Sequence, residues 1–103
     1  MSRLRRLVLS DRYFFITCNL LRSRRTLDEH DLGRLARSLA RLRAKHGVAL
    51  TAWVLLPDHW HAILYPRHPL AISALLKVLK VSSMVAVNRG RRETGELWQG
   101  CFF

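Results

Sequence analysis

The sequence predicts an α+β fold, a split β-α-β arrangement (βαββαβ) with one antiparallel sheet and both helices on one face of it. Segments that alternate like strands and segments with helical periodicity follow one another in the order β-α-β-β-α-β. Right-handed crossovers make this order pair most naturally as a split sheet, in which the first and third strands are central, antiparallel neighbours. No repeat or linker interrupts the 103 residues, so residues 1–103 are expected to form one domain with one sheet face uncovered.

The first strand is expected at residues 13–20, YFFITCNL, which are rich in aromatic and β-branched side chains. Alternation assigns one side of this strand to the core and the other to the uncovered face of the sheet. The core set is Phe14, Ile16, Cys18 and Leu20, and the uncovered set is Phe15, Thr17 and Asn19.

The first helix is expected to begin at a capping box formed by Thr26 and Glu29 and to end near Gly47. Apolar residues recur at helical spacing and should form its buried stripe, which is Leu32, Leu35, Ala36, Leu39 and Leu42. A basic stripe lines the other side of the helix, at Arg34, Arg37, Arg41 and Lys45. Such a stripe is either a solvated face or a ligand site, and the pattern favours the solvated face.

Residues 48–56, VALTAWVLL, are almost wholly apolar, which predicts a strand covered on much of both faces. Pro57 and Asp58 then turn the chain into a strand at residues 59–65, HWHAILY. Its core set is Trp60, Ala62 and Leu64, and its uncovered set is His59, His61, Ile63 and Tyr65. A second helix is expected from residue 70 to about residue 88, with a buried stripe of Leu75, Leu76, Leu79 and Val85. Residues 97–103, LWQGCFF, predict a closing strand.

The chain is strongly basic, with 18 Lys and Arg against 7 Asp and Glu and a net charge of +11. Arginine dominates, and its planar fork suits phosphate, so the composition favours a polyanionic partner, with nucleic acid first. A high genomic GC content would also enrich arginine, which leaves this interpretation open. No segment approaches the roughly 18 unbroken apolar residues of a spanning helix, so we expect a cytoplasmic protein without a membrane partner. The chain has only two cysteines, Cys18 and Cys101, which are far apart in the sequence and do not suggest a disulfide framework. Both are expected to be small core residues.

Residues 56–66, LPDHWHAILYP, place two histidines on the same face of a strand, about 6.6 Å apart along it. Two imidazoles at this spacing can bind one metal ion, with oxygen ligands and a substrate phosphate in the remaining positions. In the antiparallel pairing, Thr17 and Asn19 should lie beside His59 and His61. The spacing alone leaves a second interpretation open, in which both histidines are half-buried or surface residues without a metal.

The segment LLPDHWHAILYP resembles the histidine-hydrophobic-histidine (HUH) motif of single-tyrosine transposases of the insertion-sequence-200-like and REP-associated type. Three further segments are similar to the same family, in the same order. YFFITCNLLRSRR resembles its first strand and basic loop, ALLKVLKVSSMVAVNR its second helix, and TGELWQGCFF its closing strand. The resemblance covers about residues 12–103.

This resemblance implies a ferredoxin-like fold, a homodimer, and DNA transposition by cleavage and rejoining of single-stranded hairpin DNA through a 5′-phosphotyrosine intermediate. It implies that His59 and His61 are catalytic and bind a divalent metal, Mg²⁺ or Mn²⁺, at the scissile phosphate. The candidate nucleic-acid-binding residues are cations of the loop after the first strand, of the second helix and of the basic turn that follows it: Arg22, Arg24, Arg25, Lys77, Lys80, Arg89, Arg91 and Arg92.

Two features depart from the family pattern. Trp60 is bulkier than the aliphatic residue that usually separates the histidines. The nucleophilic tyrosine of the family lies on a helix after the closing strand, which is expected beyond Phe103 and often supplies a further metal ligand. Tyr13 and Tyr65 are expected side by side at the far end of the strands from the histidines, so neither is a good substitute. The 103 residues alone are therefore expected not to complete transposition.

Two other function classes remain open on the sequence. The first is a non-catalytic module that grips single-stranded DNA or RNA with the uncovered sheet face and the arginines. The second is a metal-independent endoribonuclease that uses the histidines as acid and base.

Overall fold

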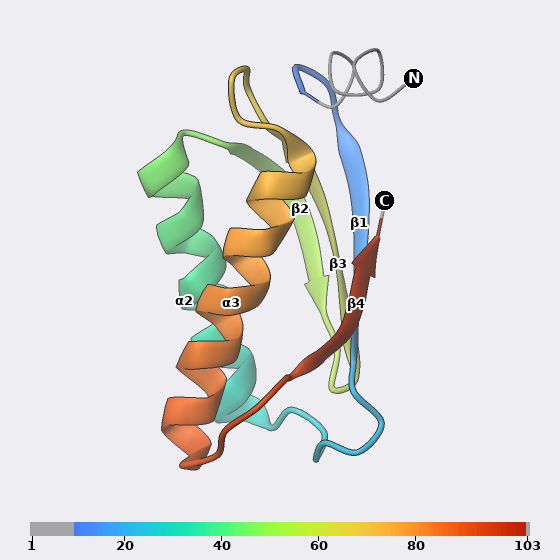
Figure 1. Cartoon of the computed structure of the whole chain (residues 1–103), viewed down its shortest axis with the longest axis vertical. Coiled ribbons are helices and arrows are strands. Elements are labelled where there is room, and N and C mark those ends of the chain that lie inside the picture. The colour runs from blue at the N-terminus through green and yellow to red at the C-terminus, as the bar shows by residue number, and fades with distance from the viewer. Residues whose placement is uncertain (1–9, 103) are drawn as a thin grey trace.

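The computed structural model describes residues 10–102, which form four strands and two helices. The strands are β1 (Phe14–Leu20), β2 (Ala49–Leu55), β3 (His59–Tyr65) and β4 (Trp98–Phe102), and the helices are α2 (Glu29–His46) and α3 (Ile72–Arg91). Both helices lie on one face of the sheet, and no described residue forms a layer over the other face (Figure 1). The predicted α+β class and the order of the elements are therefore confirmed.

The sheet is antiparallel, with its strands in the order β2-β3-β1-β4. β1 and β3 are the central pair, as predicted. Thr17 lies opposite His61, and Asn19 lies opposite His59. Because partners in an antiparallel pair point to the same face, the two polar residues of β1 lie beside the two histidines of β3 on the uncovered face.

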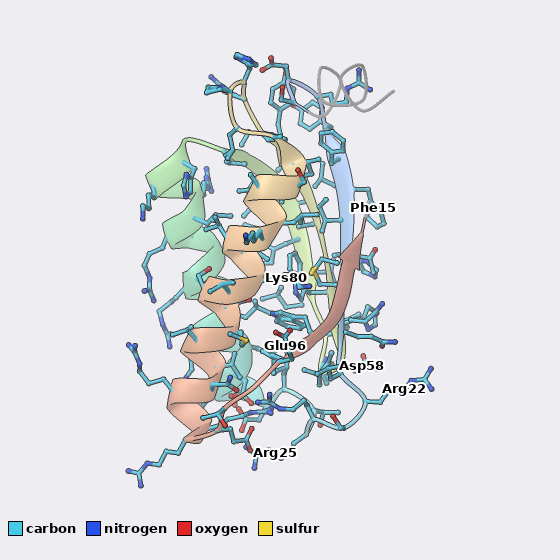
Figure 2. The ribbon with its side chains drawn as sticks, viewed as in Figure 1. Phe15, Arg22, Arg25, Asp58, Lys80 and Glu96 are labelled. Carbon is cyan, nitrogen blue, oxygen red and sulfur yellow. A yellow bond between two sulfur atoms is a disulfide. The ribbon has the colours of Figure 1, made fainter. Side chains whose placement is uncertain are left out.

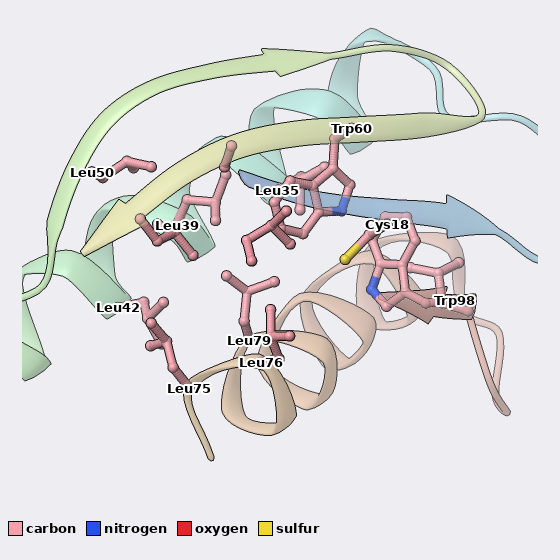
Figure 3. Close-up of a cluster of buried hydrophobic side chains, with 14 of the residues drawn as sticks. Cys18, Leu35, Leu39, Leu42, Leu50, Trp60, Leu75, Leu76, Leu79 and Trp98 are labelled. Atoms are coloured by element: carbon pink, nitrogen blue, oxygen red, sulfur yellow. The ribbon is translucent and has the colours of Figure 1, made fainter. Parts of the chain in front are cut away.

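The core lies between the sheet and the helices (Figure 3). Trp60 is fully buried there, as are Leu35 of α2 and Leu75 of α3. All of the predicted core residues of β1 and β3 are buried except Phe14, which is half-buried and packs against the core. Full burial of one such apolar side chain contributes roughly 1.5–3 kcal/mol. The strand that presents the histidines is thus anchored through its opposite side.

Strand β2 is more exposed than predicted. It forms an edge of the sheet, so only β3 flanks it. Trp53 is 41% exposed and Val54 is 55% exposed. The prediction of a strand covered on both faces was wrong, because an apolar run does not reveal whether a strand is central or at an edge.

Helix α2 begins two residues later than the predicted Thr26–Glu29 capping box implies. The N-cap is Asp28, whose carboxylate accepts a hydrogen bond from the Asp31 amide at 2.9 Å. In return, the Asp31 carboxylate accepts one from the Asp28 amide at 3.0 Å. This reciprocal pair replaces the Thr26–Glu29 pair. The helix ends as predicted at Gly47, which adopts a left-handed conformation with φ of 62°.

Helix α3 begins two residues later and ends about three residues later than predicted, and its buried stripe differs at one position. It extends to Arg91 and is followed by Arg92 in a left-handed conformation with φ of 59°. Val85 is 41% exposed, whereas Val87 is fully buried. Val85 was therefore wrongly assigned to the core, since at helical spacing Val87 continues the row from Leu79 and Ser83 at intervals of four. Within residues 10–102, no helix has both the length and the apolar character needed to cross a membrane.

Cys18 and Cys101 form a disulfide bond that joins β1 to β4. The expectation that both cysteines belong to the core is confirmed, since Cys18 is fully buried and Cys101 packs against the core. The expectation that they form no disulfide was wrong. The two residues are 83 positions apart in the sequence, but the topology puts the first and last strands side by side with these residues in register. Sequence separation therefore concealed their proximity.

Candidate functional site

The candidate site is centred on the two histidines of β3. The alternation of this strand sends Trp60 into the core and leaves His59 and His61 half-buried on the uncovered sheet face. Their ring centroids are 5.0 Å apart, and the ring planes are inclined by 76°. The two imidazoles therefore converge on one small region of the sheet surface, as predicted.

Each imidazole is held through its Nδ1 atom by an oxygen. His59 Nδ1 lies 2.7 Å from the Asp58 carboxylate, which can only accept when it is ionised. His61 Nδ1 lies 3.0 Å from the Thr17 hydroxyl. When both Nδ1 atoms donate, each Nε2 carries the free lone pair that a metal ion requires. Asp58 was not predicted as an orienting residue, although its place directly before His59 was a usable signal.

These two histidines fit one edge of a metal site rather than a complete site. Among residues 10–102 there is no group of three or more His, Cys, Asp or Glu side chains that could hold a metal ion. A protein site with two imidazoles leaves positions for amide, water or phosphate oxygens, and Asn19 lies opposite His59 in the register. Such an open arrangement suits contact with a substrate phosphate better than a closed structural site does.

Aromatic rings extend the site along the sheet. Phe15 is 60% exposed, lies on the side of the sheet away from the helices, and stacks on the His61 ring with centroids 5.3 Å apart (Figure 2). Tyr13 and Tyr65 make an edge-to-face contact at 4.9 Å. They lie beside each other as predicted, beyond the Phe15–Ile63 pair from the histidines. Their placement therefore agrees with the expectation that neither tyrosine adjoins the histidine pair.

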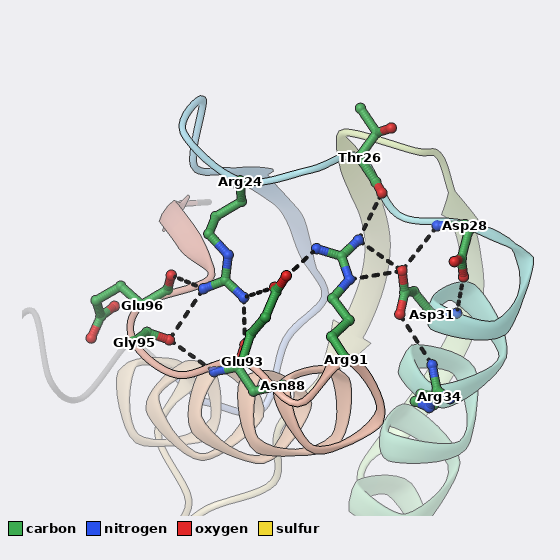
Figure 4. A network of polar contacts seen from close by, with 10 residues as sticks. All are labelled: Arg24, Thr26, Asp28, Asp31, Arg34, Asn88, Arg91, Glu93, Gly95 and Glu96. Atoms are coloured by element: carbon green, nitrogen blue, oxygen red, sulfur yellow. Dashed lines mark hydrogen bonds and ion pairs between the residues drawn. The ribbon is translucent and has the colours of Figure 1, made fainter.

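The candidate nucleic-acid-binding cations fall into two groups. The first group lies at the surface: Lys80 is half-buried, and the exposed members are Arg22, Arg25, Lys77, Arg89 and Arg92. The other two, Arg24 and Arg91, point into the protein and bind its own polar groups (Figure 4). The exposed cations lie on several sides of the molecule rather than around the histidines alone.

Arg91 and Asp31 form a buried ion pair that fixes α3 to the start of α2. The Arg91 side chain is 2% exposed and that of Asp31 is 1% exposed, with Nη2 and Oδ2 2.7 Å apart. Arg34 binds the other oxygen of the same carboxylate at 3.1 Å. Burial alone would raise the pKa of Asp31, but hydrogen bonds from Arg91 and the Asp28 amide, with the Arg91 charge, hold this pKa below its usual range.

Arg24 closes the loop that follows β1. Its guanidinium binds the Asn88 side chain and the Glu93 carboxylate, the latter at 3.0 Å. Asn88 also donates to the Gly95 carbonyl at 2.9 Å. These contacts tie together the loop after β1, the end of α3 and the approach to β4, at the end of the β1–β4 pair where Leu20 lies opposite Trp98. Arg24 and Arg91 were predicted to bind nucleic acid, because a basic segment shows no sign of its internal partners.

The fold and the histidine pair together define an α+β domain with two neighbouring imidazoles on the uncovered face of an antiparallel sheet. The chain belongs to the family described as "Transposase IS200 like", whose model matches residues 8–103. A search of curated proteins found no match.

Two solved structures have the same fold. One is a REP-associated tyrosine transposase bound to a REP hairpin, with 21% sequence identity and a TM-score of 0.71 over 90% of this chain. The other is a protein from Deinococcus radiodurans R1 assigned as a transposase, with 18% identity and a TM-score of 0.73 over 89% of this chain. This chain spans 55% of the length of the first structure and 78% of the second.

Proposed function

We propose that this domain takes part in DNA transposition by cleaving and rejoining single-stranded hairpin DNA with the help of a divalent metal ion. The observation that carries the proposal is the convergence of His59 and His61, each anchored through Nδ1, on an open sheet face. Family membership supports a transposase, and one structural relative is bound to a REP hairpin. A homodimer and a cytoplasmic location belong to the same proposal.

The histidines would hold Mg²⁺ or Mn²⁺ through their Nε2 atoms. When bound there, such an ion would polarise the scissile phosphate and stabilise charge on the leaving oxygen. The ionised Asp58 carboxylate keeps His59 in the tautomer that leaves Nε2 free. Thr17 orients the His61 ring and can accept from its Nδ1 in the same tautomer, and Trp60 anchors the strand on the core side. The role of this chain is therefore to position and activate the phosphate.

The nucleophile would be a tyrosine on a helix beyond Phe103. Its phenolic oxygen would attack the scissile phosphorus, forming a bond to the 5′ phosphate while the bond to the 3′ oxygen breaks and that oxygen takes up a proton. Rejoining reverses this exchange, so no external energy source is needed. Tyr13 and Tyr65 lie beyond Phe15 from the histidines, so residues 1–103 alone are proposed to bind DNA without forming the covalent adduct.

The metal site is tested first on the chain itself. Mn²⁺ binding is measured from the electron paramagnetic resonance signal of the free ion. It should be lost in His59→Ala and in His61→Ala. His30→Ala, which removes an exposed imidazole from α2, is the matched control and should bind Mn²⁺ as the wild type does. Unchanged Mn²⁺ binding in both site variants would remove these histidines from the metal site.

The chemistry is tested on a protein extended through the following helix. That protein should form a covalent adduct with a hairpin DNA in Mn²⁺ or Mg²⁺, and either histidine variant should abolish the adduct. Adduct formation that persists in both variants would contradict the assignment.

A second candidate function, a non-catalytic module for single strands, is favoured by the exposed rings of the sheet face. Tyr13 is 61% exposed and Phe15 is 60% exposed, and stacking of a base on such a ring is worth about 1–3 kcal/mol. This function predicts salt-sensitive binding of single strands in EDTA that survives loss of both histidines and comes with no adduct in the extended protein. Cleavage of RNA in EDTA would instead indicate an endoribonuclease.

A further inference from the structure

A basic groove runs between α2 and α3 on the side of the helices that faces away from the sheet. Its lining is Arg34, Arg37, Arg41, Ser82, Val85, Ala86, Arg89 and Gly90, and its volume is about 530 Å³. The core stripes of both helices point the other way, toward the sheet. The groove therefore lies on the opposite side of the molecule from the histidine pair.

The positive charge of the groove is largely uncompensated. Arg34 is paired with Asp31, but no ion pair in the described part of the chain involves Arg37, Arg41 or Arg89. A second hollow shares Arg41 and Ser82 with the groove and adds Lys45. From residue 34 to residue 45, at a rise of about 1.5 Å per residue, the row of cations on α2 spans roughly 16 Å.

The close packing of the two helices shapes this groove. The hydroxyls of Ser38 and Ser82 meet at 3.2 Å across the helix contact. At Gly90, an added Cβ would lie 2.2 Å from Cζ of Arg34, so the guanidinium rests directly on the backbone of α3. The absence of a side chain at Gly90 therefore leaves room for the Arg34 guanidinium at the end of the groove, where Arg34 is also paired with Asp31.

The lining identifies the ligand as a phosphate backbone rather than exposed bases. No aromatic side chain lines the groove, so it offers no surface on which a base could stack. What it offers is a row of guanidinium groups on rigid helices, which suits the closely spaced phosphates of a duplex and carries no base readout. The aromatic rings are on the sheet face instead.

We propose that this groove binds the phosphate backbone of a double-stranded DNA segment while the histidine face engages a single strand. The proposal rests on the proposed function in that DNA is taken as the polyanion. It revises the reading of Arg34, Arg37, Arg41 and Lys45 as a solvated face, and it adds Arg37 and Arg41 to the candidate DNA-binding residues.

The test measures binding of a short blunt DNA duplex to the chain by fluorescence anisotropy, over a series of salt concentrations. The groove variant is Arg37→Gln, Arg41→Gln and Arg89→Gln combined. The matched control is Arg12→Gln, Arg43→Gln and Arg67→Gln combined, which removes the same charge from exposed positions outside the groove. Each lost phosphate contact should lower the slope of log affinity against log salt by about 0.9, so the groove variant should lose up to about 2.7 and the control much less.

Three results would overturn the proposal. Equal losses in the two variants would mean that net charge alone attracts the duplex. An unchanged slope in the groove variant would mean that the groove makes no contact with DNA. A loss confined to single-stranded DNA of the same length would contradict the assignment to a duplex.

A glycine pair supplies a second, independent test. Gly90→Ala should displace the Arg34 guanidinium and weaken duplex binding, while the gain of about 1 kcal/mol in helix propensity protects the fold. In Gly33→Ala the new Cβ would lie 3.5 Å from Arg37 Nη1, an ordinary contact, so binding should stay at the wild-type level. Duplex binding that is equally unaffected by both changes would count against a role for Arg34.

The histidine variants separate this proposal from the proposed function. His59→Ala and His61→Ala should lose Mn²⁺ and keep duplex binding, whereas the groove variant should keep Mn²⁺ binding and lose duplex affinity. If the histidine variants kept Mn²⁺, the metal site would be contradicted and the duplex-binding groove would not. If the groove variant kept its duplex affinity, the groove would be contradicted and the metal site would not.

Discussion

The sheet face and the helix face of this domain differ in chemistry although they share one core. The sheet face carries His59 and His61, with Phe15, Tyr13 and Tyr65 farther along it, and it has few charges. The helix face carries a row of arginines and a groove without aromatic lining. The net charge of +11 does not reveal this difference, because a sum over the whole sequence does not show on which face the cations lie. Binding strength and chemistry can therefore be altered separately, which the following predictions use.

The division arises from the two periodicities of the chain. In β3 every second side chain enters the core, so Trp60 points to the helices while His59 and His61, its neighbours in the strand, point to the opposite face of the sheet. In α2 the leucines enter the core at intervals of three and four, which leaves Arg34, Arg37 and Arg41 on the outer side. A substitution in the shared core should affect both faces, and one on a surface should affect a single face.

The largest expected effect comes from Asp31, because its buried ion pair with Arg91 joins the two helices that cover the sheet. Asp31→Ala leaves Arg91 buried without its carboxylate, which should lower the free energy of unfolding by about 3–5 kcal/mol. Urea denaturation followed by circular dichroism measures this change. Glu29→Ala, in the exposed first turn of the same helix, is the control and should cost no more than about 1 kcal/mol. A cost for Asp31→Ala as small as that of the control would show that the pair is not a structural link.

The same carboxylate should give the domain an acid-sensitive step. The folded pKa of Asp31 lies below its unfolded value of about 3.9, so its stabilising contribution is complete above that pH and is lost as pH falls through the folded pKa. Unfolding measured between neutral pH and pH 3 should show this loss in the wild type and a flatter profile in Asp31→Asn. Parallel profiles for the two proteins would assign the acid step to other groups.

An intermediate effect is expected at Thr17, and it should be confined to the sheet face. Thr17→Val removes the oxygen that holds His61 Nδ1, and loss of such an orienting partner usually lowers metal affinity by about 10- to 100-fold. Mn²⁺ titration measures the change. Thr51→Val is the matched control, since Thr51 lies on β2 and its hydroxyl binds the Ile63 carbonyl instead of a histidine. Duplex binding should be the same in both variants, and weakened duplex binding in Thr17→Val would break the independence of the two faces.

Much of the architecture could be predicted from the sequence, because alternation and helical periodicity are local properties. The register of Thr17 with His61 followed from the strand order once β1 and β3 were taken as neighbours. What could not be predicted depends on which distant groups meet. The Cys18–Cys101 disulfide and the Arg91–Asp31 pair join residues 83 and 60 positions apart, and neither has a local signature.

The site itself divides in the same way. The histidines and their face were predictable from a short segment, whereas the groove required knowing how α2 and α3 are placed against each other. One helix shows that its own arginines point outward, but not that Arg89 of the other helix lies across from them. The edge position of β2 was hidden for a related reason, since Trp53 looks like a core residue until its strand is given a place in the sheet.

The smallest effect is expected at Val85, where sequence and structure disagree about which way a side chain points. Val85→Ala should change the free energy of unfolding by less than about 0.5 kcal/mol, because Val85 is 41% exposed on the groove side of α3. Val87→Ala, the same truncation two residues along, should cost about 1–3 kcal/mol, because Val87 is fully buried. Urea denaturation of the two variants measures both values. If Val85→Ala proved the costlier change, α3 would have to be rotated about its axis, and that rotation would carry Arg89 out of the groove and toward the core.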